Sequence, residues 1–149
     1  MNAREQADAL LRALGNALGL PLVPDADGAC GLRIDERLEL TLRLHEPQAA
    51  LLVYAQVGTL PAVQPETVLR RLLAANHVWE GSQGATWSLL GEQLTLSRLW
   101  PLQDLDAAGL AEGLARFAEV ALAEQTRLSA PGASSPAGAA ALPPGVWAA

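Results

Sequence analysis

The sequence contains no lysine and only one cysteine. Its 10 basic residues are all arginines and stand against 16 aspartates and glutamates, which gives a formal net charge of −6. Nucleic acids and anionic membranes attract clusters of Lys and Arg, so this balance argues against both as partners. Cys30 alone cannot form an internal disulfide or a cysteine-rich metal site, which fits a reducing compartment.

Long apolar runs are also missing. No window reaches the roughly 18 consecutive apolar residues that cross a bilayer. The N-terminus carries Arg4, Glu5, Asp8 and Arg12, where a secretory signal peptide keeps an uncharged apolar stretch. We therefore expect a cytoplasmic protein. At 149 residues, 50% of them hydrophobic, the chain is long enough for one domain with a real core.

Hydrophobic periodicity predicts three helices and five strands. Asn2 and Glu5 form a capping-box signature before the first helix, and Gly19 is a stop signal after it. Leucines alternate with polar residues over 38–44, which is typical of a half-buried strand, and Gly91-Glu92 suits a two-residue hairpin turn. The expected elements are helices at 3–18, 66–76 and from a cap at Asp104 or Asp106 to about 128, and strands at 30–34, 38–44, 50–57, 85–89 and 94–98.

The order α-β-β-β-α-β-β-α predicts an α+β fold in which helices pack on an antiparallel five-stranded sheet. We assign residues 1–128 to a single domain of this kind. Residues 129–149 carry no charge and are dominated by Ala, Gly, Pro and Ser. Because such a composition buries too little apolar surface to offset the entropy of ordering, we expect a disordered tail there.

Catalytic motifs are hard to find. The sequence has no Gly-x-Ser-x-Gly elbow, no Walker loop and no Gly-x-Gly-x-x-Gly run, so we expect no cofactor and no enzyme. Cys30, His77 and Glu80 lack the paired spacings of a metal site, and no metal is expected. An enzyme remains an alternative if Cys30, His45 or His77 lies in a pocket with convergent polar groups. Several carboxylates are interpreted as parts of a solvated surface, namely Glu39, Glu112, Glu119 and Glu124.

Apolar side chains are more numerous than one small sheet and two helices can cover. The residues in question are those of the 66–76 helix together with Leu52, Tyr54, Trp87, Leu99 and Trp100. Exposed apolar patches of a few hundred Å² usually contact a partner, so the pattern favours self-association and capture of an apolar peptide. The alternative is that these side chains fill the core of a tight monomer.

Several short sequence motifs follow one another along the chain. They are Leu10-Leu11-Arg12-Ala13-Leu14-Gly15, Leu18-Gly19-Leu20, Leu72-Leu73-Ala74-Ala75-Asn76, Leu94-Thr95-Leu96 and Pro101-Leu102-Gln103-Asp104-Leu105. Together with the element order and the acidity, they make residues 3–128 resemble the class I type III secretion chaperones, the Tir-chaperone or CesT-like family.

The resemblance implies a function without catalysis. Such a protein is a bacterial homodimer that binds the unfolded N-terminal segment of a secreted effector in the cytosol, without hydrolysing ATP. The alternative with the same fold is a regulatory partner, an anti-activator, of the secretion system. The resemblance places the dimer interface at Leu69, Leu72, Leu73, Asn76 and Trp87. It places effector-binding residues at Leu11, Leu14, Leu18, Leu32, Ile34, Leu40 and Leu42.

Overall fold

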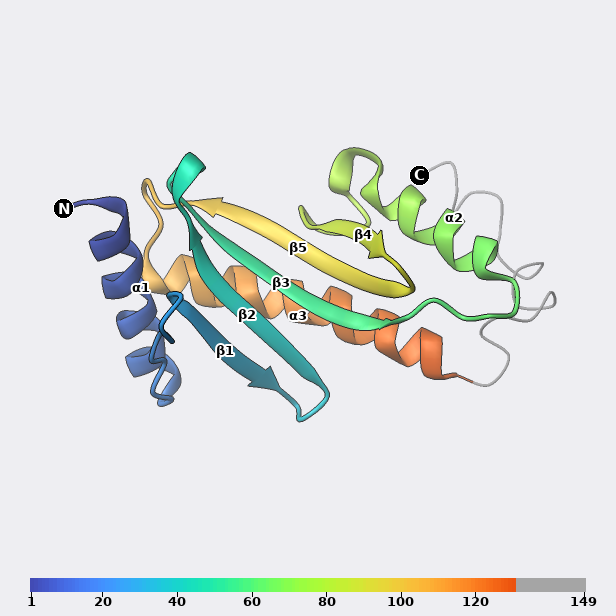
Figure 1. The fold of residues 1–149 in the computed structure, drawn as a ribbon, viewed down its shortest axis with the longest axis horizontal. Coiled ribbons are helices and arrows are strands. Elements are labelled where there is room, and N and C mark those ends of the chain that lie inside the picture. Colours follow the sequence, from blue (N-terminus) through green and yellow to red (C-terminus); the bar gives the residue numbers. More distant parts are fainter. Residues whose placement is uncertain (131–149) are drawn as a thin grey trace.

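A computed structural model of the chain describes residues 1–130 (Figure 1). The expected α-β-β-β-α-β-β-α order is confirmed, and so is the α+β class. The elements are α1 (Ala3–Leu18), β1 (Ala29–Ile34), β2 (Leu38–His45), β3 (Ala50–Thr59), α2 (Pro65–Asn76), β4 (Thr86–Leu90), β5 (Gln93–Pro101) and α3 (Ala107–Ser129). The predicted disordered tail falls almost wholly outside the described residues. None of the helices in residues 1–130 has the length and apolar content to cross a membrane.

Local signals at the ends of the elements are confirmed. The Asn2 side chain accepts a hydrogen bond from the Glu5 N–H at 2.8 Å, and the Glu5 carboxylate accepts one from the Asn2 N–H at 3.0 Å. At α3 the cap is Asp106 and not Asp104, because its carboxylate accepts from the Gly109 N–H at 2.7 Å. The β4–β5 turn places Gly91 at a φ of 59°, the left-handed conformation that glycine adopts without steric cost.

All five strands form one antiparallel sheet in the order β1-β2-β3-β5-β4. The first three strands follow one another in the sheet as an antiparallel meander. The chain then passes through α2 to the outermost strand β4, and β5 returns between β4 and β3. Strands β1 and β4 are therefore the two edges of the sheet, each with one strand neighbour.

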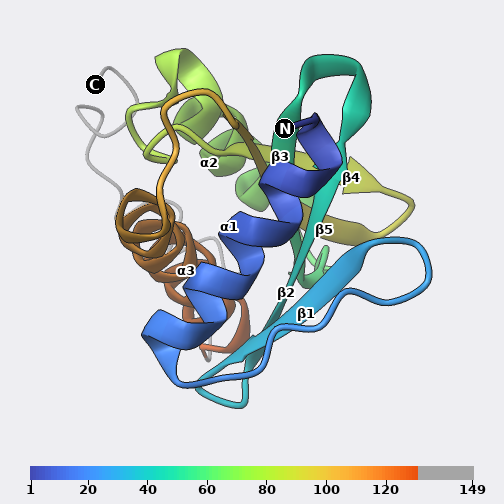
Figure 2. The ribbon, with the colours of Figure 1, turned by 90° about the vertical axis from the view of Figure 1, so that its left-hand side faces the viewer.

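Within residues 1–130, the helices leave one face of the sheet open. Helix α3 runs behind the strands in Figure 1, α1 packs beside α3, and α2 lies at the β4 end (Figures 1 and 2). On the open face, Leu52 and Tyr54 are half-buried and Leu99 is exposed.

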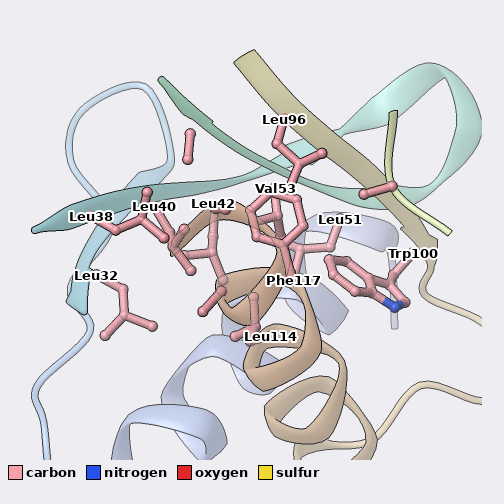
Figure 3. Close-up of a cluster of buried hydrophobic side chains, with 14 of the residues drawn as sticks. Leu32, Leu38, Leu40, Leu42, Leu51, Val53, Leu96, Trp100, Leu114 and Phe117 are labelled. Atoms are coloured by element: carbon pink, nitrogen blue, oxygen red, sulfur yellow. The ribbon is translucent and has the colours of Figure 1, made fainter. Parts of the chain in front are cut away.

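The core lies between the sheet and helices α1 and α3. Figure 3 shows leucines of β1, β2 and β3 pointing toward α3, with Phe117 of the helix between them. The rings of Trp100 and Phe117 are tilted by 57° at a centroid distance of 6.4 Å. Full burial of one such aliphatic or aromatic side chain stabilises the fold by about 1.5 to 3 kcal/mol. This layer therefore fixes the sheet and the two helices relative to each other.

Two expectations about burial are wrong. Trp87 and Trp100 are buried by the chain itself, with 7% and 8% of their surface exposed, so no partner is needed to cover them. Glu124 is not on the solvated face of α3. It is 1% exposed and forms ion pairs with Arg71 of α2 and, at 3.6 Å, with Arg127. The sequence pattern along α3 could not show that Arg71 of α2 would reach this part of the helix.

Candidate functional site

The candidate catalytic residues do not form a site. Cys30 is buried, and burial together with the charges of Asp25 and Asp8 raises the pKa of its thiol, the opposite of what a nucleophile needs. His45 is half-buried and His77 is exposed. Within residues 1–130, no three His, Cys, Asp or Glu side chains are placed to hold a metal ion.

The first of two apolar hollows lies between α2 and the edge strand β4, and we call it the α2–β4 groove. Its volume is about 120 Å³. Leu72 and Trp87 are buried in it, whereas Leu73 is 68% exposed. Its lining is Leu69, Leu72, Leu73, Asn76, Trp87, Ser88, Leu89 and Leu94. The structure thus brings together all of the residues that the family resemblance assigns to the dimer interface.

Asn76 has a local role in this groove. Its side-chain amide donates to the Trp87 carbonyl at 2.9 Å, and its side-chain oxygen accepts from the Trp87 N–H at 2.7 Å. These are the two hydrogen bonds that a neighbouring strand would make with an edge residue of β4. Asn76 therefore replaces a strand partner at this position and ties the end of α2 to β4.

The second hollow, which we call the β1–α3 groove, has a volume of about 350 Å³. Leu18 at the end of α1 and Leu32 and Ile34 of β1 form one side. Residues of α3 form the other, and Asp35 lies at the end of β1. The complete lining is Leu18, Leu32, Ile34, Asp35, Ala111, Leu114, Ala115, Ala118, Glu119 and Leu122.

The expected effector-binding residues divide into two groups. Leu18, Leu32 and Ile34 line the β1–α3 groove. The others lie in the core with at most 1% of their surface exposed, so they have no surface to offer a ligand in this conformation. These core residues are Leu11, Leu14, Leu40 and Leu42.

The sequence patterns did not predict which residues of α3 line the β1–α3 groove. Ala111, Ala115 and Ala118 recur at spacings of four and three, so they lie on one side of α3. Their small side chains leave space where leucines would fill it. Asp35 and Glu119 were also missed, because nothing in the local sequence places a β-turn beside a helix more than 80 residues away.

Solved structures share this fold. A chain of the ExsC–ExsE complex matches with a TM-score of 0.73 and 23% identity, over 84% of this chain and 95% of that chain. A chain of the HopA1–SchA chaperone–effector complex matches with a TM-score of 0.70 and 20% identity, over 83% of this chain and 95% of that chain. A chain in the structure of the Yersinia pestis type III secretion chaperone SycH with a stable fragment of YscM2 matches with a TM-score of 0.66 and 18% identity. The match covers 78% of this chain and 98% of that chain.

The sequence itself identifies the family. A search of curated proteins finds no match. The model of the Tir chaperone protein (CesT) family, however, matches residues 9–127, which is most of the chain and all of the sheet. The chain therefore belongs to the Tir chaperone protein (CesT) family of type III secretion chaperones, as the order of its motifs predicts.

Proposed function

We propose that the protein is a cytoplasmic chaperone that binds the unfolded N-terminal segment of a secreted effector as a homodimer. It keeps that segment soluble and competent for secretion, without hydrolysing ATP and without enzymatic activity. The observation that carries the proposal is the β1–α3 groove, an apolar hollow beside an edge strand. Membership of the secretion-chaperone family and the fold shared with the HopA1–SchA chaperone–effector complex support it.

The groove suits an extended chain. Leu32 and Ile34 are two residues apart in β1, so their side chains leave the strand on the same side, about 6 to 7 Å apart. Within the described part of the chain, strand β1 pairs only with β2, which leaves its other edge for main-chain hydrogen bonds. A bound segment can then place alternate side chains in the groove while its backbone pairs with β1. Burial of apolar surface supplies the affinity, so capture needs no chemical step.

A second copy of the chain is the proposed occupant of the α2–β4 groove. None of the described side chains that line this groove is charged, and Leu73 and Leu89 expose 68% and 41% of their surface beside it. A twofold axis next to α2 would place the same apolar surface of each copy against the other, the usual arrangement of homodimers. The net charge of −6 keeps such a dimer and its bound segment soluble.

The proposal is tested by light scattering and by a pull-down from the native cytoplasm with the tagged full chain as bait. We expect a mass of twice 15.6 kDa and a bound secreted protein, identified by mass spectrometry, whose N-terminal segment suffices for binding. The control bait is Ala115→Trp, which fills the β1–α3 groove and should lose the client while keeping the dimer mass. A clientless monomer would refute the proposal.

The same preparation distinguishes the alternative role. A regulatory partner, or anti-activator, would also bind a protein segment, and the fold shared with the ExsC–ExsE complex is compatible with either role. If the bait retains a regulator of secretion and no effector, the alternative holds.

A further inference from the structure

The β1–α3 groove is apolar inside but acidic at its rim. Among the residues that the structure describes, the charged side chains that line it are Asp35 and Glu119 alone, and both are exposed. Among the described residues neither carboxylate takes part in an ion pair, whereas Glu39, Glu46, Glu112 and Glu124 all do. Within residues 1–130, the rim therefore offers two negative charges that no arginine pairs with directly.

Two separate elements hold these carboxylates beside the hollow. Residues 35–37 connect β1 to β2, and Asp35 and Glu36 are the central residues of a β-turn in this connection, with φ values of 52° and 57°. The Arg37 N–H closes the turn by donating to the Ile34 carbonyl at 3.1 Å. Asp35 thus follows the groove residue Ile34 directly on a closed turn. Glu119 follows the groove residue Ala118 on α3, a helix of 23 residues. Neither position depends on a long loop.

The other hollows differ in charge. Among the described residues, the α2–β4 groove has no charged lining. The cavity between α2 and α3, which Glu119 also lines from its other side, contains Arg71 and Arg127 as well as Glu124. The β1–α3 groove alone among these three combines an apolar interior with charges of one sign.

We propose that this groove selects client segments in which a basic residue stands next to the apolar residue that fills the hollow. The inference rests on the proposed function and adds the chemistry of the client. The apolar side chain contacts Leu32, Ile34 and the α3 alanines, while the neighbouring Arg or Lys lies at the rim between Asp35 and Glu119. Since rim charges act mainly on specificity, a segment with a neutral or acidic residue there binds more weakly.

The test uses three synthetic peptides and the full chain. Each peptide alternates Leu and Val with Thr. The first carries two arginines beside its central apolar residues, the second carries citrulline, which has nearly the shape of arginine but no charge, and the third carries glutamate. Their Kd values are measured by fluorescence anisotropy at low and high salt.

We expect the arginine peptide to bind about 5- to 10-fold more tightly than the citrulline peptide, and the glutamate peptide to bind most weakly. The difference should shrink at about 1 M salt, where the Debye length is about 3 Å. The double variant D35N/E119Q should bind the arginine and citrulline peptides equally. A control variant, E66Q/E112Q, removes the same charge from exposed positions outside the groove and should keep the preference.

Three outcomes overturn the inference, in whole or in part, and they are distinguishable. Equal binding of all three peptides by the unmodified chain refutes the charge selection but leaves capture of apolar segments standing. Absence of binding by every peptide refutes the groove as a segment-binding site, and the proposed function with it. If D35N/E119Q still prefers the arginine peptide to the citrulline peptide by the full factor, Asp35 and Glu119 are not the source of the charge selection.

Discussion

Cys30 of β1 is paired with Leu42 of β2 and is 2% exposed, under the α1 side of the core. Burial first, and then the charges of Asp25 and Asp8, raise the pKa of its thiol. The thiol is therefore kept neutral, as in an apolar packing residue. This environment explains why the lone cysteine has a structural role in this fold.

A raised pKa has a defined effect on stability. The unfolded thiol, with a pKa near 8.5, loses its proton before the folded one, so the free energy of unfolding should fall as the pH rises above about 8.5 and through the folded pKa. We expect Cys30→Val to lack this part of the pH dependence. Denaturant titrations of both proteins between pH 7 and pH 10 measure it. Identical slopes for the two proteins would contradict the prediction.

Gly113 of α3 shows how one residue sets the helix-to-sheet distance. A Cβ at this position would lie 2.9 Å from the Trp100 ring. Alanine is about 1 kcal/mol better than glycine within a helix, but the overlap with the ring costs about 1 to 3 kcal/mol. We therefore expect Gly113→Ala to destabilise the fold, as measured by urea denaturation.

The control for Gly113 is the Trp100→Leu background. In that background the added methyl group does not overlap with an indole ring, so Gly113→Ala should be neutral or stabilising. Equal losses in both backgrounds would show that Trp100 is not the cause.

At the scale of elements, the Arg71–Glu124 ion pair joins α2 to α3. Glu124 accepts from both Arg71 Nε, at 3.3 Å, and Arg71 Nη2, and its side chain is 1% exposed. Asn76 joins the other end of α2 to β4. Between them, these contacts fix the orientation of the helix that carries Leu69 and Leu73.

Removal of the Glu124 charge should be costly. Glu124→Gln leaves the largely buried Arg71 guanidinium without its counter-charge, so we expect a loss of about 3 to 5 kcal/mol in the free energy of unfolding. The matched control is Glu112→Gln, which breaks the exposed Glu112–Arg116 pair and should cost at most about 0.5 kcal/mol. The double variant R71M/E124L should recover most of the loss. Equal effects of Glu124→Gln and Glu112→Gln would show that burial adds nothing to this pair.

At the scale of the whole molecule, the proposed dimer makes stability depend on protein concentration. Since association stabilises only the folded chain, Tm should rise with concentration. Leu73→Asp places a charge in the proposed interface and should abolish this dependence. Because Leu73 is 68% exposed, the same change should alter the stability of the isolated chain by no more than about 0.5 kcal/mol. Calorimetry over a 100-fold concentration range tests it.

Val23→Asp is the matched control, since Val23 is 76% exposed and lies outside both grooves. It should keep the concentration dependence. A Tm that is independent of concentration in the unmodified protein would argue against the dimer.

The elements, their order and the family could all be predicted from patterns along the chain. Helix caps, a two-residue turn and alternating leucines act between residues at most a few positions apart, so Asn2, Gly91 and the β2 leucines could be interpreted locally. The order of the short motifs predicted the family. The family resemblance in turn predicted five of the residues that line the α2–β4 groove.

Local patterns did not predict which side chains are buried and which line a groove, because both depend on the packing of the folded chain. Arg71 and Glu124 are 53 positions apart, and no local pattern distinguishes Glu124 from the exposed Glu112. Likewise, Leu40 and Leu32 both look like inward-facing strand residues, yet only Leu32 borders the hollow beside the α3 alanines. Burial and groove shape are set by how whole elements pack against one another, and that packing depends on side chains from distant parts of the chain at once.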